Sequence, residues 1–570
     1  MKRVLETSRS SSAYARKRAV TACQVCRARR TKCDQKKPRC SFCEKTGAEC
    51  ISDPAGLSSF DPASIAILER LDGLEKKLDS LQRGTSRAQD SVNPSPVNQS
   101  TLNPNRQIPL AESLLPGRLE TVLAWPIFQE SVSPLPTNRE LLTPGTQLPV
   151  AANPILGDEL SASATQEYLH MFFDHVHIKN PVLNEAYIRR LVRKISIDGP
   201  GWDSESCLAL LVCANGAIAR PFGSASLSGE ELRRSTGCAL FGAAQKRMGI
   251  ILDSATILEA QCLFFAGVYL MTSLRLYDAW RSFLQSLAIC QNFDFIRRNT
   301  GQATEIGNTA EESIYWSCWK SERELRLELG LPDFGSSSAL TAPQRFPSLP
   351  FTDDDPRMLR AWYFYLSEIS LWRLEMDART DISACLSEMQ DGVGQRTPDR
   401  LLDRIAEVSE IYSQQSGAWQ DSLPSMVSIS KETACGRSRT DALRFILMGR
   451  KTYINELITW PFIIQAVGQS DPNPSYRAWL AKGVRAHLER LEINSPGFHH
   501  RHHGTWLMIR SSARSACILI AMARACGTDL FPGAWRETVQ DTIDMLHFWS
   551  SEVAGLGAVA EFCQDHLARV

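Results

Sequence analysis

Six cysteines fall in one short run near the N-terminus, and their spacing constrains this part of the chain more than any other feature does. The run reads ACQVCRARRTKCDQKKPRCSFCEKTGAEC over residues 22–50. Its cysteines are Cys23, Cys26, Cys33, Cys40, Cys43 and Cys50. The spacing is C-x2-C-x6-C-x6-C-x2-C-x6-C, so the second three cysteines repeat the spacing of the first three.

The repeated half-motif has the ligands for a two-metal cluster. Two tetrahedral zinc ions need eight thiolate bonds. Six thiolates supply eight bonds only if two of them bridge both metals, and a two-fold repeat of C-x2-C-x6-C is a natural way to build this arrangement. Because the run contains no histidine, the spacing predicts two zinc ions held by thiolates alone.

Basic side chains surround the cysteines. They are Arg27, Arg29, Arg30 and Lys32 between the second and third cysteines, then Lys36, Lys37 and Arg39 in the next loop. A short helix after each C-x2-C would carry such side chains outward, toward phosphates and base edges of nucleic acid. Pro38, two residues before Cys40, predicts a rigid turn that joins the two halves.

This segment resembles the fungal binuclear zinc cluster, the Zn2Cys6 type of DNA-binding domain, in all six cysteines, the basic run and the loop proline. The resemblance implies that Cys23 and Cys40 bridge the metals. One zinc would then take Cys23, Cys26, Cys33 and Cys40, and the other would take Cys40, Cys43, Cys50 and Cys23. It also implies base contacts from Arg29 and Arg30, with Lys32 alongside. Family members usually have lysine where this chain has Arg30; since arginine can bond guanine bidentately, readout should survive.

Two other interpretations of the cysteine run stay open. Six cysteines can form three disulfides in a small secreted module. However, the preceding sequence MKRVLETSRSSSAYARKR is polar and basic rather than a signal peptide. The eleven other cysteines lie scattered through apolar stretches, as expected of reduced core thiols. The second alternative is a zinc module that binds protein rather than DNA.

The charge distribution is asymmetric along a chain whose formal net charge is zero. Over residues 14–50, Lys and Arg outnumber Asp and Glu by eleven to three, so the remainder of the chain is mildly acidic. A basic head on an acidic body suits a protein that touches nucleic acid at one end. The cluster of Arg16, Lys17 and Arg18 predicts a nuclear import signal, additional phosphate contacts, or both.

A leucine-rich repeat follows the cysteine run. Ile67, Leu71, Leu74, Leu78 and Leu81 recur at alternating steps of four and three, as in the a/d seam of a coiled coil. The pattern predicts a short parallel coil that pairs two chains in a homodimer. A single amphipathic helix lying on the body is the alternative.

Composition divides the chain into five segments: a basic tail (1–20), the zinc cluster domain (21–52), a coiled-coil helix (60–83), a flexible linker (84–155) and an all-α regulatory domain (156–570). Ser, Asn, Gln and Pro dominate the linker, apart from the apolar segment LAWPIF (123–128), which we expect to dock on the body. The last segment shows apolar residues at helical spacing, so the fold class is mainly α. It also resembles the regulatory body, or middle homology region, of fungal zinc cluster proteins.

Other residue groups have two interpretations each. The run HHRHH (499–503) could bind a metal, but it lies between SPGF and GTW, so a solvated loop is the simpler prediction. Trp316, Trp319, Trp362 and Trp372 predict core packing rather than the lining of a ligand pocket. Charged residues of the helix at 315–329 predict an ion-paired face; they are Glu322, Arg323, Glu324, Arg326 and Glu328. We find no phosphate-binding glycine loop, G-x-S-x-G elbow or HExxH motif, which argues against an enzyme.

These features together predict a nuclear, soluble protein that binds double-stranded DNA. The resemblance implies a transcription regulator of RNA polymerase II genes that reads CGG-type triplets, with co-regulators or the transcription machinery as partners. Similar bodies occur in regulators of fungal secondary-metabolite gene clusters. No apolar stretch reaches membrane-spanning length, so no membrane partner is expected. The alternatives are a zinc-dependent protein-interaction scaffold and a small-molecule sensor with a DNA-binding head.

Overall fold

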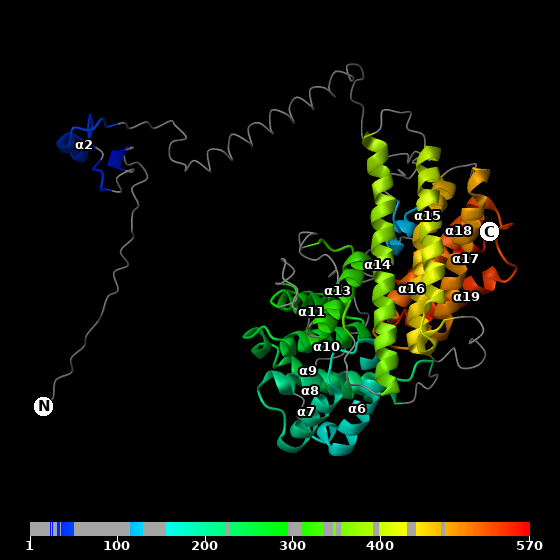
Figure 1. Cartoon of the computed structure of the whole chain (residues 1–570), viewed down its shortest axis with the longest axis horizontal. Helices are drawn as coiled ribbons and strands as arrows, with labels where there is room; N and C mark the ends of the chain where they lie inside the picture. Colours follow the sequence, from blue (N-terminus) through cyan, green and yellow to red (C-terminus); the bar gives the residue numbers. More distant parts are fainter. Residues whose placement is uncertain are drawn as a thin grey trace. The chain divides into compact units, whose positions relative to one another are not determined.

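The computed structural model divides the chain into two compact units, residues 1–102 and residues 103–570 (Figure 1). The structure describes residues 23, 25–26, 31–34, 36–50, 114–128, 156–223, 229–293, 296, 309–333, 346–348, 355–391, 398–429, 441–468 and 473–570. These residues form α-helices and short 3-10 helices, and no β-strand occurs among them. The prediction of a mainly α fold is therefore confirmed.

The large unit, which we call the body, consists of helices in two groups. The first group comprises α6 (Ala162–His175), α7 (Glu185–Asp198), α8 (Ser204–Ile218), α9 (Glu230–Gln245), α10 (Ile257–Thr272), α11 (Leu276–Cys290) and α13 (Thr309–Leu329). The second comprises α14 (Pro356–Asp391), α15 (Pro398–Asp421), α16 (Ala442–Gly468), α17 (Arg477–Asn494), α18 (Thr505–Cys526), α19 (Trp535–Trp549) and α20 (Leu556–Leu567). In Figure 1 the cyan and green helices gather on one side of the long helix α14 and the yellow to red helices on the other.

Short connections between these helices include 3-10 turns. They are η5 (Asp158–Leu160), η6 (His177–Lys179), η7 (Ile250–Leu252), η8 (Ser425–Val427), η11 (Pro474–Tyr476) and η12 (Ser495–Gly497). Local sequence sets where several helices begin. Asp203 accepts a hydrogen bond from the Ser206 N–H at 2.7 Å and caps α8. Thr256 and Glu259 form a capping box at the start of α10.

Helices α8 and α10 are buried on nearly every face, from Ser206 to Ile218 and from Glu259 to Thr272. A helix that is apolar all round must be enclosed by other helices, because no face of it favours water. These two helices therefore form the centre of the first group.

Helix α18 holds the same central position in the second group. The sequence analysis predicted no apolar stretch long enough to span a membrane. By length and composition alone, however, α18 is long and apolar enough to do so. However, 89% of its most apolar window is buried inside the body. Its buried Arg510 and Arg514 are both paired with Glu328. Such packing is that of a core helix.

Part of the predicted linker is folded. Within 84–155, residues 114–128 form α4 (Leu119–Leu123) and η4 (Pro126–Phe128), which lie against α18. Glu120 forms a bidentate ion pair with Arg510, with N–O distances of 2.8 and 2.7 Å. Trp125 contacts Trp460 at a ring-centroid distance of 5.8 Å. We call residues 114–128 the strap. The docking of residues 123–128 on the body agrees with the prediction, whereas residues 114–122 pack on the body although the composition assigned them to the linker.

The run 499–503 is not the solvated loop that its flanking residues suggest. His500 and Arg501 are buried, and only His499 is exposed. Arg501 forms ion pairs with Glu230 and Glu552 and donates a hydrogen bond to the Thr272 carbonyl. The sequence prediction was wrong for this run because the burial comes from helices that lie far away along the chain.

The four tryptophans predicted to pack in the core rather than line a pocket, Trp316, Trp319, Trp362 and Trp372, are all buried. Trp372, however, also lines a cavity of the body. The predicted ion-paired face of α13 is present in part, because Glu322 and Arg326 pair within the helix at 3.1 Å, whereas two further carboxylates pair across to other helices. Glu324 pairs with Arg450 at 2.7 Å, and Glu328 pairs with Arg510 at 2.7 Å. Helix α13 thus presents its charges to neighbouring helices rather than to solvent.

Two helical glycines give opposite predictions for the same substitution. A Cβ at Gly216 of α8 would overlap the backbone carbonyl of Tyr168 in α6, whereas a Cβ at Gly242 of α9 would meet open space. We expect Gly216→Ala to lower the free energy of unfolding by about 1–3 kcal/mol or more, because neither backbone can yield easily. Gly242→Ala should raise it by about 0.4–1 kcal/mol. Urea unfolding followed by tryptophan fluorescence measures both, and equal effects of the two changes would contradict the α6–α8 packing.

Candidate metal centre

Four of the six predicted ligands converge on one point. Cys23, Cys26, Cys40 and Cys43 are buried, and their Sγ atoms all lie within 4.8 Å of one another. The Sγ distances are 3.7 Å from Cys23 to Cys40, 3.6 Å from Cys23 to Cys43 and 3.6 Å from Cys26 to Cys40. Tetrahedral zinc with Zn–S bonds of about 2.3 Å separates its sulfur ligands by about 3.8 Å. The three distances fit edges of such tetrahedra.

The other two cysteines, Cys33 and Cys50, are half-buried and pack against the same cluster. The Cys40 backbone N–H donates a hydrogen bond to the Cys50 Sγ at 3.4 Å, and this bond is the main cause of a lowered pKa for the Cys50 thiol. All six sulfurs therefore gather in one module, as the spacing predicts.

The two halves of the motif also share a backbone feature. The Thr31 N–H donates to the Cys26 carbonyl at 2.9 Å, and the Ala48 N–H donates to the Cys43 carbonyl at 3.1 Å. Each bond spans the same number of residues from the second cysteine of its half. The repeat in the sequence is thus a repeat in the local structure.

A short helix and a turn arrange the second half. Helix α2 (Ser41–Thr46) begins within the second C-x2-C, directly after Cys40, rather than after Cys43 as the sequence predicts. It ends where Gly47 takes a left-handed φ of 66°. The Asp34 carboxylate accepts one hydrogen bond from the Ser41 N–H, at 2.9 Å, and another from the Ser41 hydroxyl. These two bonds lower the pKa of the Asp34 carboxyl. Residues 37–39 bend between the halves, with a cis bond before Pro38. Asp34 was not predicted, since no spacing rule marks a cap that lies seven residues away.

Burial of the thiols explains why the module needs a cation. Burial raises the pKa of Cys26 to about 12 and also raises that of Cys43. At neutral pH these groups are therefore protonated by themselves, and a bound zinc ion stabilises the thiolate form. Metal binding then releases protons and supplies folding free energy. The donor set fits zinc, and the resemblance assigns Cys23 and Cys40 as the bridging ligands.

The predicted DNA-contacting residues divide into two sets. Lys32, Lys36, Lys37 and Arg39 are exposed on the surface of the module. Arg27, Arg29 and Arg30 lie outside the described residues, as do the predicted coiled-coil residues Ile67, Leu71, Leu74, Leu78 and Leu81. The assignment of all these side chains to DNA or to a second chain stays a prediction.

Metal analysis tests the bridged cluster. We expect two zinc ions per chain in the purified protein, because six thiolates in this arrangement can complete two tetrahedra. Cys23→Ala and Cys40→Ala should each lose more zinc than Cys33→Ala, since each removes a bond to both metals. One zinc per fully folded chain would contradict the bridging assignment.

Comparison with known proteins agrees with this geometry. Residues 21–56 match the fungal Zn(2)-Cys(6) binuclear cluster domain. The chain is 26% identical over 257 residues to ecdB of Aspergillus rugulosus, which carries the name of a transcription factor; the match covers 45% of this chain and 44% of that protein. It is 28% identical over 106 residues to transcription factor FBD3 of Gibberella moniliformis, covering 16% of this chain and 14% of that protein.

The chain thus spans less than half the length of each of these relatives. The family match and the convergence of the cysteines agree on the N-terminal module. Residues 21–56 of this chain are therefore similar to the fungal Zn(2)-Cys(6) binuclear cluster domain, and the cysteines described within them have the arrangement that zinc requires.

Proposed function

We propose that this protein is a nuclear, sequence-specific transcription regulator whose zinc module reads CGG-type triplets in double-stranded DNA. The observation that carries the proposal is the buried cysteine cluster, which holds a small module with exposed basic side chains. Two relatives that carry the name of transcription factors support it.

The chemistry of the module suits a contact with DNA. Lys32, Lys36, Lys37 and Arg39 are exposed and carry positive charge, which neutralises phosphates and releases counterions. Lysines of this kind fix the position of a protein on the duplex, whereas base edges are read by residues that enter the groove. By resemblance to the family, Arg29 and Arg30 have that second role.

A substitution pair separates the two roles. Arg30→Ala should reduce discrimination between matched and mismatched triplets by about 1–3 kcal/mol, because a bidentate contact to guanine is lost. Lys36→Ala should weaken binding to both duplexes about equally and reduce the dependence of affinity on salt. Titrations of both duplexes at several salt concentrations measure these effects.

Two outcomes of those titrations would count against the proposal. Equal losses on both duplexes for Arg30→Ala would remove its role in base readout. A parent protein that forms no specific DNA complex at any ionic strength would instead be a zinc-dependent protein-interaction scaffold. Neither outcome would follow from a general loss of folding, provided that each variant keeps its zinc.

We propose further that residues 60–83 pair two chains as a parallel coiled coil. Replacing both Leu74 and Leu78 with Lys should place like charges in a dry seam that two or three heptads cannot tolerate. Affinity for a paired site should then fall toward that for a single triplet, because the second module loses its high effective concentration. Binding of the paired site at the parent's affinity would show that the dimer interface is elsewhere.

The target genes define the last part of the proposal. Control of RNA polymerase II genes in a fungal metabolic cluster, without catalytic activity of its own, is consistent with the resemblance of the body to regulatory bodies. Mapping of the sites bound across the genome tests this point. Bound sites scattered without relation to metabolic genes would contradict it.

A further inference from the structure

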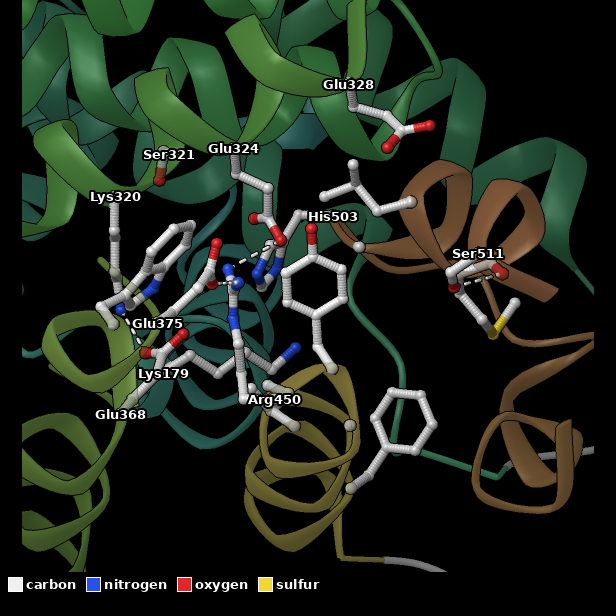
Figure 2. Close-up of a pocket in the computed structure, with 18 of the residues that line it drawn as sticks. Lys179, Lys320, Ser321, Glu324, Glu328, Glu368, Glu375, Arg450, His503 and Ser511 are labelled. Atoms are coloured by element: carbon white, nitrogen blue, oxygen red, sulfur yellow. Dashed lines mark hydrogen bonds and ion pairs between the residues drawn. The ribbon is translucent and has the colours of Figure 1, made fainter. Parts of the chain in front are cut away.

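A cavity of about 220 Å³ lies inside the body, between α13, α14, α16, α17 and α18. Figure 2 shows Lys320, Glu368 and Glu375 on one side, Glu328 and Ser511 on the other, and Glu324, His503 and Arg450 between them. Its volume is below the range of about 300–1,000 Å³ typical of sites for drug-sized ligands. A ligand of this cavity must therefore be a smaller molecule.

The carboxylates that line the cavity are all matched by cations. Glu324 pairs with Arg450 at 2.7 Å, and Glu375 pairs with Arg379 at 2.9 Å. Glu368 pairs with Lys320, while Glu328 is held by Arg510 and Arg514. Arg490, a further lining cation, pairs with Glu456 at 2.6 Å. The walls are thus a set of satisfied ion pairs.

Lys179 is different from these cations. It ends η6 and lines the cavity, and its side chain is 7% exposed. Among the described residues its ammonium has no ion-pair or hydrogen-bond partner, and burial is the cause of a pKa lowered to about 8. At neutral pH the group is still mainly charged. A buried charge without a counter-ion is costly.

A second unpartnered donor lies in the same wall. The Gly504 N–H donates to the Nδ1 of His502 at 3.0 Å, so in the neutral ring the proton is on Nε2. Burial, with Lys179 nearby, holds the pKa of His502 well below its usual range, so the ring is neutral. Its Nε2 atom is buried and has no hydrogen-bond partner among the described residues.

The wall also has one buried acceptor without a partner among the described residues, the Oδ1 of Asn180. The two unpartnered donors, Lys179 and His502, are the complement of an anion. We infer that this cavity binds a small monocarboxylate, with the Lys179 ammonium as its counter-ion and the His502 Nε2–H as a hydrogen-bond donor. One unmatched positive charge fits one negative charge rather than the two of a dianion such as phosphate, because the other lining cations named above are already paired. Met271, Phe364, Phe445 and Leu507 supply apolar surface for the hydrocarbon part of the ligand.

The test compares acids with their uncharged amides on the full, zinc-loaded chain. The probes are hexanoate and benzoate, against hexanamide and benzamide, each at millimolar concentration. All 13 tryptophans lie between residues 125 and 549, so the thermal transition of tryptophan fluorescence reports on the body alone. We expect at least one acid to raise the midpoint by about 1–3 °C and its amide to have no such effect.

Variants assign the effect to the site. Lys179→Met should weaken binding of the acid at least about tenfold, as measured by calorimetric titration. His502→Phe keeps the ring and removes the donor, so it should also weaken binding. Lys194→Met is the matched control, because Lys194 is exposed, lies outside the cavity and pairs with Glu205. The response of this control should equal that of the parent.

Three outcomes would overturn the inference. They are an unchanged thermal midpoint with either acid, equal changes of the midpoint with an acid and its amide, or undiminished binding of the acid by Lys179→Met. Without ligand, Lys179→Met should raise the thermal midpoint, because it removes an unpaired buried charge. A lowered midpoint would show that Lys179 has a partner in the protein and would also overturn the inference. DNA binding does not enter these readouts, so failure of this inference and failure of the proposed function are separable.

Discussion

The bond between zinc and thiolate holds the N-terminal module together. The buried cluster of this module consists of cysteines, with only Val25, Phe42 and Ala48 as other apolar side chains packed against it among the described residues. So small a group cannot bury enough apolar surface to offset the loss of chain entropy. The free energy of metal binding is therefore also the folding free energy. The exposed lysines keep fixed positions only while the metals join the two halves.

The body is stabilised by different physics. Its central helices α8, α10 and α18 are enclosed by other helices, so apolar burial supplies the main driving force. Buried ion pairs then join segments that are distant in sequence, as Arg510 does between Glu120 of the strap and Glu328 of α13. Such pairs contribute little net stability, because desolvation offsets the attraction, but an unpaired member is strongly unfavourable. They restrict which helices can lie next to each other.

Among this set of matched charges, Lys179 is notable because its matching charge is not supplied by the described residues. Every carboxylate around the cavity is paired with a cation, namely Glu324, Glu328, Glu368 and Glu375. The buried ammonium of Lys179 is not paired with an anion among the described residues, so it lowers the free energy of unfolding, and a bound anion would remove this penalty. Such a ligand would stabilise the body without touching the zinc module. The two units would then respond to separate chemical signals, metal in one and a small acid in the other.

Features whose physics is local could be predicted from the amino-acid sequence alone. Cysteine spacing indicated the metal ligands, because ligands in one short segment come together whatever surrounds them. Helical periodicity indicated the fold class and the burial of tryptophans such as Trp316. The remaining features came from the packing of distant helices. Arg510 lies 390 residues from its partner Glu120, and the burial of His500 and the isolation of Lys179 depend on helices brought together by folding. Local pattern has no information on which distant side chain will neutralise a charge, because that choice is made by packing.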